Sequence, residues 1–188
     1  MFLTRKPTDT EIRSFISAQQ QSNFSYGPLE ITRGEAPSGY NVDHNRILLG
    51  SGAQVFSAAE AAIEQWKMFD FDWVRLCFDS TPIEAGATVA VIVKHLGFWS
   101  MNACRIVYVI DEAERYGFAY GTLAEHAERG EERFMVEWNR EDDTVWYDLL
   151  AFSKPGLMAS LGYPLTRALQ KRFAQDSKKA MQQAMSPR

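Results

Sequence analysis

Cysteine is scarce in this chain. Its 188 residues include two cysteines, Cys77 and Cys104, which lie far apart in apolar stretches and have no CxxC spacing. Such a pair provides neither a zinc-ligand motif nor the disulfide framework of small secreted domains. We therefore expect two buried, reduced thiols and a cytoplasmic location, with a disulfide as the alternative.

Long apolar runs are missing as well. The strongest candidate, Val89–Val93, stops at Lys94, whereas a membrane-spanning helix needs about 20 apolar residues. Residues 1–12 hold no apolar core of the length found in signal peptides. We expect neither a transmembrane segment nor a signal peptide.

Positive charge is in short supply. The 20 Lys and Arg residues are outnumbered by 24 Asp and Glu residues, which gives a formal net charge of −4. Proteins that bind nucleic acid normally present a basic face to the phosphates, so a nucleic-acid partner is not expected. The hydrophobic content of 46% is ordinary for a globular chain of this length. We expect one domain over residues 1–188, with a helix and an extended loop in 1–43 and the core in 44–188.

Motifs for a metal or a cofactor are not found. His44, His95 and His126 are far apart, and none has a second ligand at helical or hairpin spacing. The run Gly50–Gly52 precedes a helix but lacks the rest of a P-loop or a dinucleotide fingerprint, so it predicts a strand-to-helix turn. We expect no resident metal and no cofactor.

What the sequence does contain is a clear change of hydrophobic period. A short polar helix is predicted for residues 9–21, an extended loop for 22–43 and a first strand for 45–50. A second helix is predicted to begin at Ser57, whose side chain would form a capping box with Glu60. From Phe71 onward the period is two, and the candidate strands are 73–79, 87–94, 104–110, 115–123, 131–139 and 144–152.

The chain should end in a long amphipathic helix. Pro155 interrupts the last strand candidate, and Gly162-Tyr163-Pro164 is a favourable helix start. Its apolar stripe comprises Leu165, Leu169, Phe173, Ala180 and Ala184. An antiparallel sheet in the same chain needs a cover for its apolar face. We therefore predict an α+β fold in which a strongly curved antiparallel sheet of six to seven strands wraps around this C-terminal helix.

Alternation along the sheet predicts which side chains face the helix. The large and aromatic face should carry Tyr108, Phe118, Tyr120, Thr122, Glu132, Phe134 and Trp138. The opposite face should carry glycines and arginines and meet water, with Glu131 near Arg105 and Arg133. The register of the strand that follows Asn139 stays open; a four-residue loop would turn Asp148 outward, opposite Met135, which costs less than burying the carboxylate.

Glu132 is the exception on the apolar face. A carboxylate there must be hydrogen-bonded, protonated or next to a wet cavity, because burying an unpartnered charge is costly. One interpretation makes it a strand-end residue that reaches solvent and has no chemical role. The other makes Glu132, with Tyr108, Tyr120 and His126, the polar end of an aromatic pocket of the kind that binds small molecules.

Several motifs together resemble one uncharacterised family of bacteria and plants, catalogued as domain of unknown function nineteen-ninety. They include "YGPLEITRG", "GYNVDHNRILLGSG", "YGFAYGTLAEHAERGEERF" and "VWYDLLAFSKPG", and the resemblance spans roughly residues 24–184. The matching positions include Arg105, Gly117, Tyr120, Gly121, Thr122, His126, Gly130, Glu131, Glu132, Arg133 and Phe134. The resemblance implies a helix-grip fold, as in START lipid-transfer domains and birch-pollen-allergen-like proteins, but no established activity.

Three functions stay open at this point. The aromatic face with its polar end favours a protein that binds a small apolar or amphipathic ligand between sheet and helix. Related scaffolds include cyclases, hydratases and hydrolases, which would make Glu132 or His126 a general acid or base. An interaction module that works through the loop of residues 22–43 or through self-association, and so a homo-oligomer, is the third.

Overall fold

The computed structural model describes residues 1–35, 38–77, 80–95, 97–155 and 163–186. The short elements are β1 (Phe2–Leu3), η1 (Ile31–Arg33), η2 (Lys67–Phe69) and β3 (Val74–Cys77). The helices are α1 (Asp9–Gln19), α2 (Ala53–Glu64) and α3 (Tyr163–Ala184). The long strands are β2 (Asn41–Ser51), β4 (Thr88–His95), β5 (Phe98–Glu112), β6 (Arg115–Thr122), β7 (Glu128–Asn139) and β8 (Thr144–Pro155).

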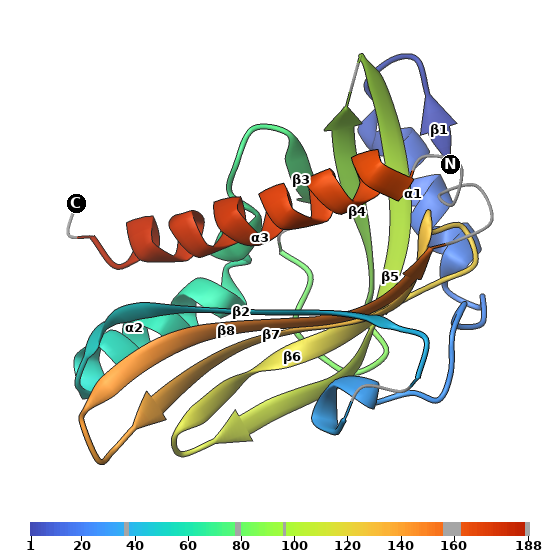
Figure 1. Ribbon diagram of the computed structural model, residues 1–188. Coiled ribbons are helices and arrows are strands. Elements are labelled where there is room, and N and C mark those ends of the chain that lie inside the picture. The colour runs from blue at the N-terminus through green and yellow to red at the C-terminus, as the bar shows by residue number, and fades with distance from the viewer. Residues whose placement is uncertain (36–37, 78–79, 96, 156–162, 187–188) are drawn as a thin grey trace.

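The strands form one antiparallel sheet in the order β2-β8-β7-β6-β5-β4-β3, with β1 paired to β5. The sheet is strongly bent, and α3 lies across its concave side (Figure 1). The predicted α+β fold, a curved antiparallel sheet that grips a C-terminal helix, is confirmed. Among the described residues, none of the helices is both long and apolar enough to cross a membrane.

The core lies between the concave face and the helices. Its largest fully buried side chains include Ile63, Met68, Phe118, Phe134, Tyr147 and Met181. The Phe118 and Phe134 rings stack with centroids 5.3 Å apart. On α3 the buried residues are Ala174, Ser177, Ala180 and Met181, whereas Leu165 is 43% exposed. The buried stripe of α3 is therefore partly different from the predicted one, because it runs through Ser177, whose hydroxyl lies 2.8 Å from that of Tyr147.

The start of α2 differs from the prediction. The helix begins at Ala53 with Gly52 as its N-cap, so Ser57 lies inside the helix and caps nothing. Gly52 has a φ of +88°, a conformation that other residues rarely adopt. The chain can therefore turn directly from β2 into the helix, and the Gly52 carbonyl accepts the Phe56 amide at 3.1 Å.

The convex face of the sheet is covered by the N-terminal part of the chain, although it was expected to face water. Ile12 and Phe15 of α1 pack on Ala90, Ile92 and Met101 of β4 and β5. Residues 24–33 lie over the middle strands, where a Cβ on Gly121 would come within 2.3 Å of the Tyr26 hydroxyl. Gly121 is thus required by close packing of this segment, which the period-two pattern could not show.

Candidate functional site

A cavity of about 370 Å³ lies between the concave face of the sheet and α3. Its apolar wall includes Trp73, Leu149, Leu169, Phe173 and Ala174. Its polar side includes Asp43, Tyr120, Thr122, His126, Glu128, Glu132 and Gln170. Phe2 and Leu165 also line it and are 57% and 43% exposed, so the cavity reaches the surface between β1 and the first turns of α3.

Glu132 stands at the polar side of this cavity. The residue is part-exposed, and because it lines the cavity, its free surface faces that space. The Tyr120 hydroxyl donates to Oε2 at 2.9 Å, and none of the described residues donates a hydrogen bond to Oε1. Burial raises the pKa of Glu132 to about 8, because removal from water disfavours the charged form more than the single tyrosine bond favours it. The same surroundings raise the pKa of Tyr120 well above its usual value.

Two further carboxylates complete the polar side. The Gln170 amide of α3 donates to Glu128 Oε2 at 2.7 Å, and burial raises the pKa of Glu128. Asp43 pairs with the Arg167 guanidinium, which donates to Oδ1 at 2.8 Å and also contacts Oδ2. Asp43 is therefore paired directly with a cation, whereas the hydrogen bonds to Glu128 and Glu132 come from the neutral Gln170 and Tyr120 side chains.

His126 lies in the loop between β6 and β7 and also lines the cavity. Its Nδ1 lies 3.0 Å from the Glu128 amide nitrogen and 3.2 Å from the Glu128 carbonyl oxygen. Burial lowers the pKa of His126 to about 4, which keeps the ring uncharged at neutral pH.

Some of the other predicted site residues line the cavity, and the rest do not. Tyr120, Thr122, Glu132 and His126 line the cavity together. Phe118 and Phe134 are fully buried in the packed core and form no part of its described lining. Trp138 packs against Phe56 in a tilted arrangement with centroids 5.8 Å apart, its indole donates to Asp143, and it is not among the described lining residues of the cavity.

Tyr108 does not face α3, and that expectation is wrong. A register shift in β5 leaves Ile106 opposite Tyr120 but Tyr108 opposite Ala119. The bulge moves Tyr108 to the convex face, since an extra residue reverses the alternation that follows it. There its hydroxyl lies 2.7 Å from Thr32 Oγ1, and the Arg33 guanidinium stacks 3.8 Å from the ring centroid.

Glu131 was expected at an exposed position and is instead 2% exposed. It does point away from α3, but residues 26–32 cover it and supply its partners. The Tyr26 hydroxyl at 2.6 Å and the Glu30 amide at 2.9 Å donate to Oε2, while the Thr32 amide at 3.0 Å and hydroxyl at 2.5 Å donate to Oε1. Arg105 donates to the carbonyls of Gln19 and Gln20 at the end of α1 and not to Glu131.

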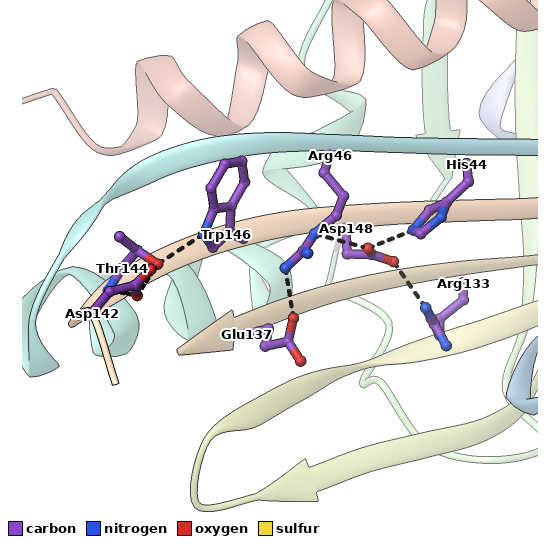
Figure 2. A network of polar contacts seen from close by, with 8 residues as sticks. All are labelled: His44, Arg46, Arg133, Glu137, Asp142, Thr144, Trp146 and Asp148. Carbon is purple, nitrogen blue, oxygen red and sulfur yellow. Dashed lines mark hydrogen bonds and ion pairs between the residues drawn. The ribbon is translucent and has the colours of Figure 1, made fainter. Parts of the chain in front are cut away.

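A second polar network lies on the convex face, centred on Asp148 (Figure 2). Asp148 pairs with Met135 in the β7–β8 register, as the length of the hairpin loop predicted. Its carboxylate is contacted by His44 Nε2 at 2.7 Å, Arg46 Nε at 3.3 Å and Arg133 Nη2 at 2.9 Å. These contacts join β2, β7 and β8, so the network fastens strands of the sheet together.

The sequence reasoning did not identify Glu128, Asp43 or Gln170 as cavity residues. A signal for Glu128 was present, because Glu128, Gly130 and Glu132 alternate on one face, but the strand was expected to start at 131. Asp43 was assigned to a loop, yet it belongs to β2. Gln170 lies on the polar side of the predicted α3 stripe, and nothing in the helical period distinguishes it from a solvent-facing residue.

Comparisons with known proteins bear on both fold and family. A protein from Dictyostelium discoideum described as a UPF0548 protein is 39% identical over 207 residues, which cover 98% of this chain and 96% of the relative. Among solved structures, hypothetical protein jhp0584 from Helicobacter pylori superposes with a TM-score of 0.59 at 11% identity, over 87% of this chain and 97% of that one. Ara h 8.0201 gives a TM-score of 0.54 at 15% identity, over 78% and 98%.

These structural likenesses show the helix-grip fold, and at such low identity they show the fold alone. The family model described as domain of unknown function DUF1990 matches residues 25–180, which is most of the chain. The resemblance seen in the sequence motifs is thereby confirmed, and the chain belongs to the DUF1990 family.

Proposed function

We propose that the protein binds a small apolar or amphipathic molecule in the cavity between the curved sheet and α3. The observation that carries the proposal is the cavity of about 370 Å³. Cavities for small molecules generally have this size, with apolar walls and a few polar groups that orient the ligand. Here Trp73, Leu169 and Phe173 stand on the apolar side, and Tyr120 with Glu132 stands on the polar side.

The size of the cavity also argues against incidental loose packing. Protein cores pack as densely as organic crystals, and voids larger than a water molecule are few. The core around Phe118, Phe134 and Val136 follows that rule, since these three side chains have no exposed surface. The proposed binding cavity lies where α3 begins, and it reaches the surface beside Phe2 and Leu165.

The test is retention of ligands by the purified protein. Native mass spectrometry with a panel of fatty acids, fatty alcohols, amines and sterols should show complexes with one molecule per chain. Amide shifts in NMR spectra should change around Tyr120, Glu132 and Leu169 and not around Asp148. A protein that retains no member of the panel, with unchanged amide shifts, would overturn the proposal.

A second candidate function is acid–base catalysis on a bound molecule. The pKa of Glu132 is raised to about 8 and that of His126 is lowered to about 4, so both groups are uncharged at neutral pH. One can then donate a proton and the other can accept one, which is the pattern that acid–base sites require. Once a substrate is found, a Glu132→Gln variant that turns it over at the wild-type rate would exclude this role for Glu132.

A further inference from the structure

The ionisable acidic groups are the only fully charged type of side chain among the described residues that line the cavity. Asp43, Glu128 and Glu132 line it, and no lysine or arginine occurs among its described lining residues. Arg167 lies just behind Asp43 and is occupied by that carboxylate. The polar side of the cavity therefore presents carboxyl groups to whatever enters, and its described lining offers no lysine or arginine to pair with an anionic headgroup.

Two of these carboxylates lack the partners that a buried charge needs. Glu132 accepts one hydrogen bond, from Tyr120 at 2.9 Å, and Glu128 accepts one from Gln170 at 2.7 Å. Both donors are neutral. By contrast, Glu131, the neighbour of Glu132 on the other face, accepts four hydrogen bonds within the protein. The protein thus supplies Glu131 with enough hydrogen-bond donors. Glu128 and Glu132, at the cavity, can each accept further hydrogen bonds from a ligand.

The carboxyl groups of the cavity suit an organic cation better than a metal ion. Among the described residues, three or more His, Cys, Asp or Glu side chains are nowhere grouped so that they could hold a metal ion. A divalent cation would need such a group, together with a largely polar cavity. The cavity here also has a large apolar part, which includes Trp73, Leu149, Leu169 and Phe173.

We propose that the ligand is an amphipathic molecule with a protonated amine or related cationic nitrogen, seated between Glu132 and Glu128, and an apolar part against Trp73, Leu169 and Phe173. This inference rests on the proposed function and names its ligand class. An ammonium group offers three N–H donors, and Glu132 has a carboxylate oxygen that accepts no hydrogen bond from the described residues. Charge-assisted hydrogen bonds of this kind are roughly twice as strong as neutral ones.

The raised pKa of Glu132 adds a measurable consequence. At pH 7 the unliganded residue holds its proton, because burial raises its pKa to about 8. An ammonium group would stabilise the carboxylate, so binding should release a proton to the buffer. The titratable and charged groups around Glu132 are Tyr120, Cys104, Tyr147, Glu128, Asp43, His126 and Arg167.

The test compares three probes with the same chain: decylamine, decan-1-ol and decanoic acid. Isothermal titration calorimetry at pH 7 should give decylamine an affinity at least about tenfold higher than either of the others. Repeating the decylamine titration in two buffers of different ionisation enthalpy should show proton release. Glu132→Gln should remove that release and most of the amine preference while decan-1-ol still binds. Glu137→Gln, on the same strand but paired with Arg46 on the outer face, is the matched control and should behave as wild type.

The outcomes separate this inference from the proposed function. If none of the probes binds, the proposed function is wrong, and the proposed cationic ligand class is wrong as well. If decan-1-ol and decanoic acid bind wild-type protein as tightly as decylamine, the cavity binds ligands but the cationic class is wrong. The same conclusion follows if Glu132→Gln keeps the amine preference. Should that variant fail to fold, Glu128→Gln and the proton release of the wild-type protein decide between the same alternatives.

Discussion

At the scale of single residues, Glu131 and Glu132 show how position decides chemistry. They are adjacent in β7 and point to opposite faces of one sheet. Glu131 lies under residues 26–32 and accepts four hydrogen bonds. Glu132 faces the cavity and accepts one. Burial without enough donors raises the pKa of Glu132 to about 8, and the carboxyl is therefore neutral at the pH where most carboxylates are charged.

This shift predicts how stability depends on pH. Between its ordinary pKa near 4.5 and the folded value near 8, Glu132 is ionised in the unfolded chain and protonated in the folded one. The free energy of unfolding should therefore fall as pH rises through that interval. His126 acts in the opposite sense: with its pKa lowered from 6.5 to about 4, it contributes stability that is lost as pH falls below 6.5. The window from pH 6.5 to 8 thus isolates Glu132 from His126.

Urea unfolding at pH 6.5 and pH 8 provides the measurement. We expect the free energy of unfolding of the wild-type protein to decline across the window by at most about 1.4 kcal/mol per pH unit. The decline should be smaller than this limit, because Glu132 is part-exposed and solvent screens its charge. Glu132→Gln cannot ionise and should lose this part of the decline, whereas Glu137→Gln should keep the wild-type slope. Parallel slopes for wild type and Glu132→Gln would show that the carboxyl titrates normally in the folded protein.

At the scale of elements, the strands and the long helix were predictable because their patterns are sustained. Strands β6, β7 and β8 and helix α3 lie where the alternation and the apolar stripe placed them, within a few residues. The errors fall where one residue changes the geometry. The bulge in β5 reverses the direction of Tyr108, and the positive φ of Gly52 starts α2 before the apparent cap at Ser57. Neither the bulge nor the positive φ changes the hydrophobic pattern of the sequence, so neither could be predicted from it.

The cover on the convex face was not predictable for a different reason. Residues 24–33 have no regular period, so their position depends on contacts with distant residues. Glu131 provides the main anchor, and Arg133 adds a hydrogen bond to the Thr32 carbonyl at 3.0 Å. The polar half of the candidate site could be anticipated through Glu132 because it broke an apolar alternation, whereas Asp43 and Gln170 reach it only through tertiary folding.

Glu131→Gln should release this segment. The amide nitrogen cannot accept the bonds that one carboxylate oxygen now accepts, so we expect a loss of roughly 2–3 kcal/mol in the local stability of residues 24–33. Trypsin cleavage after Arg33 should become at least about tenfold faster, since cleavage follows the open population. Glu132→Gln, the same substitution one residue further along, should leave the cleavage rate unchanged. An unchanged rate in Glu131→Gln as well would mean that other contacts hold the segment.

At the scale of the whole molecule, the two halves of the concave side serve different purposes. The half next to α2 is tightly packed around Trp66, Phe118 and Phe134, with Phe118 and Trp66 centroids 4.8 Å apart. The half under the start of α3 holds the cavity. Because the packed half carries the stability, the cavity half can stay open, and a ligand can enter without disturbing the main core.

This division predicts that the cavity can be filled without unfolding the protein. Ala151 of β8 lines the cavity and is the register partner of Glu132. In Ala151→Phe the new ring would occupy open space, so the free energy of unfolding should stay within about 1 kcal/mol of wild type. The affinity for decan-1-ol should fall at least about tenfold, because ring and ligand compete for one volume. Ala168→Phe, at an exposed position of α3, should change neither quantity. Wild-type affinity in Ala151→Phe would place the binding site elsewhere, because a ring beside Glu132 cannot share the cavity with a ligand of that length.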